Sequence, residues 1–95
     1  MKKLYELSEK SENLIEYDTH KNAINIRKHK ISIPELATIF SNPFAPPAMD
    51  IPDVKNSQRE KRFWAFGCTT TGWKVKIWYT YRGNRIRFIG GRKLK

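Results

Sequence analysis

Residues 73–92, WKVKIWYTYRGNRIRFIGGR, decide the fold of this 95-residue chain. They form two alternating runs around Gly83-Asn84, a pair that fits a two-residue type II′ hairpin turn because glycine accepts a positive φ. One face of the hairpin is then apolar and the other is basic, and a slip of one residue would bury the arginines. The predicted cross-strand pairs are Tyr81–Ile86, Thr80–Arg87, Tyr79–Phe88, Trp78–Ile89 and Ile77–Gly90.

A third strand is predicted over residues 62–68, where apolar side chains alternate again. The turn lies at residues 69–72. If its loop contains two or four residues, Trp64, Phe66 and Cys68 lie on the apolar face of the hairpin. The predicted core face of this meander is Trp64, Phe66, Cys68, Val75, Ile77, Tyr79, Ile86 and Phe88.

Two helices precede these strands. Asp18 is a helix N-cap for residues 20–29, and Ser32 with Glu35 forms a capping box for a second, strongly apolar helix. Residues 14–17 are a short strand candidate, and the prolines of residues 43–58 allow at most a short edge strand near residues 48–51.

The predicted fold is therefore α+β, with two N-terminal helices packed on a three- to four-stranded antiparallel sheet. Residues 1–13 are predicted to form a polar N-terminal extension and residues 14–95 a single domain.

Charge is unevenly distributed along the chain. All nine acidic residues lie between Glu6 and Glu60, whereas residues 61–95 contain ten Lys or Arg and no acid. Such a one-sided field suits a polyanion, most simply nucleic acid. The alternative is a solvated basic surface without a specific partner.

Other features exclude several classes of protein. The lone Cys68 excludes an internal disulfide and fits a reducing compartment. No apolar run approaches the ~20 residues of a membrane span, and the early glutamates exclude a signal peptide, so we expect a cytoplasmic protein without a membrane partner. We expect no metal and no cofactor, because two His and one Cys lack ligand spacing and Gly90-Gly91 lacks the pattern of a phosphate-binding loop.

An ordered series of motifs spans residues 14–92. The motifs are Glu16-Tyr17-Asp18-x-x-Lys21, Asn25-x-x-Lys28-His29-x-Ile31, Phe40-x-Asn42-Pro43, Glu60-x-Arg62-Phe63 and Arg85-Ile86-Arg87-Phe88-Ile89-x-x-Arg92. In this order they resemble the BrnT family of toxins. Departures from the family pattern are Tyr17 in place of Trp, Lys30 in place of Gly, and Gly90-Gly91 in place of Ser-Ala.

The resemblance implies a RelE-like fold and the activity of an endoribonuclease, the toxin half of a type II toxin–antitoxin pair. It also implies a cognate BrnA-like ribbon-helix-helix antitoxin, with operator DNA bound only through the toxin–antitoxin complex.

RNA can be cleaved without a metal ion when the 2′-OH attacks the adjacent phosphate and the protein supplies a base, an acid and cations. The family match favours Lys21, Lys28, Arg62 and Arg87 for this chemistry. The expected catalytic residues are Lys21, Lys28, His29, Glu60, Arg62 and Arg87. The expected RNA-binding residues are Lys74, Lys76, Arg82, Arg85, Arg92 and Trp78.

Alternative roles remain open for some of these side chains. Glu60 is either a base or arginine-positioning residue, or a partner in an ion pair with Lys61 or Arg62. His29 either transfers protons or interacts with the dipole at a helix C-terminus. Trp78 and Phe63 either stack on bases, cover a subunit or antitoxin contact, or pack under a terminal segment.

Two alternative functions also remain. The first is a nucleic-acid-binding module without catalysis, such as a decayed toxin. The second is a basic face that serves mainly to hold an acidic antitoxin segment.

Overall fold

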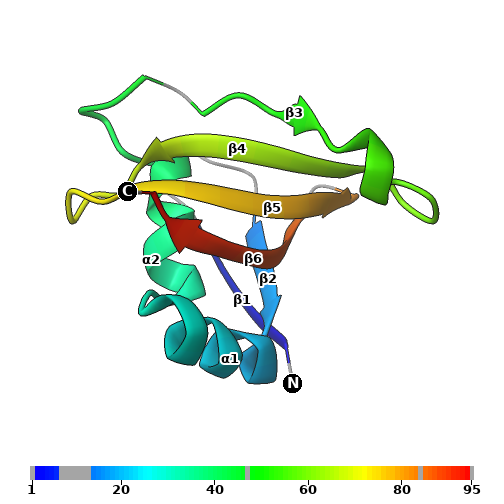
Figure 1. Ribbon diagram of the computed structural model, residues 1–95, viewed down its shortest axis with the longest axis horizontal. Coiled ribbons are helices and arrows are strands. Elements are labelled where there is room, and N and C mark those ends of the chain that lie inside the picture. Colours follow the sequence, from blue (N-terminus) through cyan, green and yellow to red (C-terminus); the bar gives the residue numbers. More distant parts are fainter. Residues whose placement is uncertain (1, 7–13, 47, 84, 95) are drawn as a thin grey trace.

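The computed structural model describes residues 2–6, 14–46, 48–83 and 85–94. Within these ranges the chain forms one six-stranded sheet with the strand order β1-β2-β6-β5-β4-β3. Figure 1 shows a strong twist, since β1 and β2 run at a steep angle to β4. The elements are β1 (Lys2–Glu6), β2 (Leu14–Asp18), α1 (Thr19–His29), α2 (Ile33–Ala37), the 3₁₀ helix η1 (Thr38–Phe40), β3 (Ile51–Pro52), the 3₁₀ helix η2 (Val54–Asn56), β4 (Arg62–Cys68), β5 (Lys74–Arg82) and β6 (Arg85–Lys93).

The α+β class is confirmed, but the prediction of a three- to four-stranded antiparallel sheet is wrong. Two strands precede the helices, and β2 pairs with β6 in parallel, so the sheet is mixed. The predicted strand at residues 14–17 is part of β2. Lys2–Glu6, expected within the polar extension, pairs with β2 as β1. Residues 1 and 7–13 lie outside the described ranges, so the boundary after residue 13 stays a prediction.

The hairpin register is confirmed next to its turn and wrong farther away. Tyr81 pairs with Ile86, Thr80 with Arg87 and Tyr79 with Phe88, and Gly83 has a φ of 63°. A bulge then shifts the pairing by one residue, so that Trp78 faces Gly90 and Ile77 faces Gly91. The predicted pairs Trp78–Ile89 and Ile77–Gly90 are therefore wrong. Asn84 lies outside the described residues, so the turn type stays a prediction.

The predicted face of β4 is also wrong. Phe63 pairs with Tyr79, Ala65 with Ile77 and Gly67 with Val75, so these three residues face the core instead of Trp64, Phe66 and Cys68. The cause is the length of the turn. Thr69 N–H donates to Trp73 O across a loop of three residues, 70–72, in which Gly72 has a φ of 96°. An odd loop inverts the alternation that loops of two or four residues would give.

Both helices begin at the predicted caps. The Asp18 carboxylate accepts a hydrogen bond from His20 N–H at 2.8 Å, and Ser32 Oγ accepts one from Glu35 N–H at 3.2 Å. The expectation that both helices pack on the core face holds best for α2 with η1. Their core side chains are Ile33, Leu36, Ala37 and Ile39. In α1 Asn25 is the buried residue; Figure 1 shows this helix beside the end of β2.

The hydroxyl of Tyr79 connects the core to the loop before β3. Tyr79 is fully buried, and its ring lies 5.5 Å from Phe40 and 6.3 Å from Phe88 between centroids. The hydroxyls of Tyr79 and Tyr81 both donate to the Asp50 carboxylate. Burial, together with these bonds to Asp50, raises the pKa of both tyrosines. Both phenols therefore stay protonated near neutral pH and hold this loop on the sheet.

We expect Gly91→Ala to lower the free energy of unfolding by about 1–3 kcal/mol, because overpacking forces the core to shift. A Cβ at this position would lie 2.7 Å from Leu36 Cδ1 and 3.0 Å from Ile77 Cγ2. Urea unfolding measures the effect. In the background Leu36→Ala, which removes the clashing atom, the cost of the alanine should shrink. An equal cost in both backgrounds would contradict this packing.

Candidate functional site

The face of the sheet opposite the core carries most of the predicted RNA-binding side chains. Alternation along β5 places Lys76, Trp78 and Thr80 on this face, because their neighbours Val75, Ile77 and Tyr79 are in the core. We call it the open face. By register its members are Glu16, Arg62, Trp64, Phe66, Lys74, Lys76, Trp78, Thr80, Arg82, Arg85, Arg87 and Arg92.

Two of the predicted catalytic arginines lie in one row across the open face. Arg62 faces Thr80 on β5, and Thr80 faces Arg87 on β6. Since neighbouring strands are ~4.8 Å apart, the Cα atoms of the two arginines are roughly 10 Å apart. The side chain of Thr80, which lies between the two arginines, is buried and donates a hydrogen bond to Lys61 O. A phosphate above Thr80 would therefore be within reach of both guanidinium groups.

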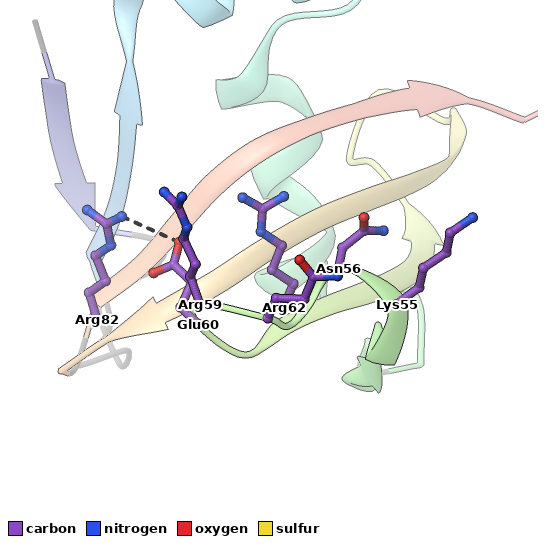
Figure 2. Close-up of a pocket in the computed structure, with 7 residues that line it drawn as sticks. Lys55, Asn56, Arg59, Glu60, Arg62 and Arg82 are labelled. Carbon is purple, nitrogen blue, oxygen red and sulfur yellow. Dashed lines mark ion pairs between the residues drawn. The ribbon is translucent and has the colours of Figure 1, made fainter.

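A basic hollow of 640 Å³ lies at the Arg62 end of this row. Figure 2 shows the guanidinium groups of Arg59, Arg62 and Arg82 pointing in the same direction from its wall. Glu60 also lines the hollow and pairs with Arg82 at 3.5 Å, rather than with Lys61 or Arg62 as the ion-pair alternative supposed. The full lining is Lys55, Asn56, Gln58, Arg59, Glu60, Arg62 and Arg82. Sequence reasoning missed Lys55 and Arg59, whose charges are offset by acids in the composition of that half of the chain.

The loop that forms this wall is fixed by Asp53. Its carboxylate accepts hydrogen bonds from Asn56 Nδ2 at 2.9 Å and from Trp64 Nε1 at 2.8 Å. Its backbone N–H donates to Arg62 O at 2.8 Å. Hydrogen bonding by Asn56, and then by Trp64, holds the pKa of the Asp53 carboxyl below its usual value. Asp53 therefore stays ionised and ties η2 to the start of β4.

A second hollow, of 170 Å³, brings together Lys21, Lys28 and His29 with Trp78. The two lysines and the histidine come from α1, and Ile89 and Gly90 of β6 complete the contact with the sheet. A Cβ at Gly90 would lie 3.1 Å from Trp78 Nε1, so the glycine lets the indole lie over β6. The two hollows have no lining residue in common. Five of the six predicted catalytic residues are thus divided between the two hollows, and Arg87 lines neither of them.

Asn25 fixes the position of α1 in this second hollow. It is buried, its Nδ2 donates to Ile31 O at 2.9 Å, and its Oδ1 accepts from Gly91 N–H at 3.2 Å. The parallel pairing of β2 with β6 ends at Arg87. The side chain of Asn25 therefore satisfies a backbone donor of β6 beyond the end of β2.

Glu16 is a functional candidate that the sequence did not single out. It lies beside Arg87 in the pairing of β2 with β6, and its Oε1 accepts from Arg87 Nη1 at 2.7 Å. Its Oε2 lies 3.5 Å from Arg85 Nη1. The only sequence signal was an acid inside an apolar strand segment, within the first motif of the family resemblance.

The remaining predicted RNA-binding residues lie nearer the start of β5. Lys76 Nζ lies 3.8 Å from the centroid of the Trp64 ring, so this lysine covers an aromatic side chain. Arg92 is exposed and faces Lys76 across the strands. Lys74 lines a third, mostly apolar hollow of 290 Å³ with Phe66 and Cys68.

The described part of the chain contains no group of three or more His, Cys, Asp or Glu side chains that could hold a metal ion. Likewise, none of the described helices is long and apolar enough to cross a membrane. The expectation that catalysis needs no metal therefore stays a prediction.

Comparisons with known proteins agree with the motifs. A family model described as the ribonuclease toxin BrnT of type II toxin–antitoxin systems matches residues 17–95. The crystal structure of the Brucella abortus ribonuclease toxin BrnT superposes with a TM-score of 0.63 at 20% sequence identity, covering 83% of this chain and 92% of the other. A search of curated proteins gives no significant sequence match.

We expect Asp53→Asn to lower stability at neutral pH and to flatten its dependence on pH in acid. The folded state lowers the pKa of this carboxyl, so its stabilising contribution is present above about pH 4 and is lost as the pH falls through the folded value. Thermal unfolding between pH 2 and pH 7 measures both effects. Parallel curves for Asp53→Asn and the wild type would contradict this role.

Proposed function

The chain belongs to the BrnT family of ribonuclease toxins of type II toxin–antitoxin systems, and we propose that it cleaves RNA without a metal ion on the open face of its sheet. The observation that supports this site is the row of Arg62, Thr80 and Arg87. Planar guanidinium groups bind phosphate oxygens in a bidentate manner. Two of them on either side of one phosphate would stabilise the negative charge that grows in the transition state.

Glu60 and His29, the two candidates for proton transfer, lie on opposite sides of the row of Arg62, Thr80 and Arg87. Glu60 precedes Arg62 by two residues and pairs with Arg82 toward the tip of the hairpin. Trp78 precedes Thr80 by two residues on the antiparallel strand, so the hollow with His29 lies in the other direction. Displacement at phosphorus needs a base near the 2′-OH and an acid near the leaving oxygen, on opposite sides of the phosphate. We assign Glu60 to the base and His29 to the acid.

Lysines and aromatic groups would bind the rest of the substrate. Lys21 and Lys28 would neutralise a neighbouring phosphate, and Trp78 would stack on an unpaired base. Arg82 and Arg85 near the hairpin tip, with Lys74, Lys76 and Arg92 at the other end, extend the positive surface along both directions of an RNA strand.

A protein antitoxin follows from the type II family. We propose that it is a BrnA-like ribbon-helix-helix protein, that operator DNA is bound only through the toxin–antitoxin complex, and that the pair acts in the cytoplasm with a toxin of RelE-like fold. The formal net charge of +10 would speed encounter with an acidic partner.

The purified chain should cleave RNA in the presence of EDTA and leave 2′,3′-cyclic phosphate ends. Arg62→Ala and Arg87→Ala should each lower kcat by roughly 10²-fold, because each removes one donor to the transition state. Gel assays of a labelled oligoribonucleotide and mass spectrometry of its fragments measure these effects. Arg27→Ala, an exposed arginine of α1 outside both hollows, is the matched control.

RNA that stays intact at high protein concentration would contradict the assignment. Salt-sensitive binding without cleavage would then favour the alternative, a nucleic-acid-binding module without catalysis. Full activity of both alanine variants would move the site away from the Arg62–Thr80–Arg87 row.

A further inference from the structure

A buried carboxylate faces one of the arginines of the proposed site. The side chain of Glu16 is 6% exposed and that of Arg87 is 13% exposed, and their closest atoms are 2.7 Å apart. The parallel pairing of β2 with β6 sets the two residues directly side by side. Arg85 approaches the other carboxylate oxygen at 3.5 Å. Glu16 is thus an acid set between two arginines of a basic face.

Stability alone gives a weak reason for this arrangement. Removing a carboxylate and a guanidinium from water is costly, and buried ion pairs replaced by apolar side chains of similar size often leave proteins equally stable. Ile15 and Tyr17 on either side of Glu16 already supply apolar burial toward the core. An acid on the open face also weakens its attraction for a polyanion.

Glu16 is poorly suited to act as the base itself. Its two oxygens are directed at two guanidinium groups, and little of its side chain reaches solvent. The side chain of Glu60 is 35% exposed and is far more accessible to a 2′-OH. The chemistry available to Glu16 is therefore to orient a cation.

We propose that Glu16 is a positioning residue that fixes the guanidinium of Arg87 toward the phosphate above Thr80. This inference rests on the function proposed above. A charged hydrogen bond restricts the rotamers of a long side chain, so that the remaining donors of Arg87 are oriented before RNA binds. The arrangement favours turnover at the expense of affinity, because the same carboxylate offsets part of the positive charge that attracts RNA.

Glu16→Gln separates these two effects because it keeps the size of the side chain and removes its charge. We expect kcat to fall at least tenfold, since a small misplacement of a catalytic group can cost up to about 10²-fold. The Kd for an uncleavable 2′-deoxy oligonucleotide at fixed salt should stay equal or decrease. Partial unfolding would weaken binding and turnover together. Glu35→Gln, which removes a carboxylate from α2, controls for net charge and should leave kcat unchanged.

A double variant shows whether Glu16 acts through Arg87. If it does, Glu16→Gln should have little further effect on kcat when Arg87→Ala is already present. Glu16→Asp, which restores the charge with a shorter reach, should recover part of the lost turnover. Unchanged kcat in Glu16→Gln, or independent effects in the double variant, would overturn the proposal.

A spectroscopic measurement distinguishes a failure of this inference from a failure of the proposed function. In ¹⁵N NMR the side-chain Nη–H signals of Arg87, whose Nη1 donates to Glu16 Oε1, should be protected from exchange with water in the wild type and exposed in Glu16→Gln. A wild type that cleaves no RNA would contradict the proposed function, whereas an Arg87 signal equally mobile in both proteins would contradict positioning by Glu16.

Discussion

The alternation of side chains along β5 is the constraint on which the rest of the structure depends. This central strand has β6 on one side and β4 on the other, and every second residue of it must face the core. The three-residue loop before β5 then sets the face of β4. Because this loop is odd, Trp64 and Phe66 lie among the cations of the open face, while the small residues Ala65 and Gly67 face the helices. Gly67 has Ile39 of η1 directly against it, where a side chain would collide.

The parts of the fold that could be predicted are those set by neighbouring residues. The hairpin pairs next to Gly83, the caps of both helices and the α+β class each depend on a few adjacent positions. The Thr-rich loop gives no comparable signal for its length, so the face of β4 was wrong. The bulge at Ile89 lies where Gly90 packs against Trp78, a residue of another strand. The parallel pairing of β2 with β6 joins distant segments, and no local pattern specifies such a partner.

The sequence identified most residues of the candidate site, but it did not predict how they are arranged in space. A basic C-terminal third identified the arginines, and the family motifs identified Lys21 and Lys28. The separation of Lys21 and Lys28 from Arg62 in two hollows follows from the crossing of α1 beside β6, which Asn25 holds in place. Glu16 was missed because an isolated acid in a strand gives no sign of its partner. The pairing of Glu60 with Arg82 across two strands was missed for the same reason.

The parallel pairing of β2 with β6 also has a consequence for synthesis on the ribosome. Glu16 and Arg87 are separated by 71 positions in the sequence. A nascent chain therefore contains β2 and both helices long before the strand that completes the sheet emerges. Contacts of such high sequence separation form late and slowly. A member of a ribonuclease toxin family is thus made beside abundant RNA in a form whose open face stays incomplete until β6 has emerged and paired.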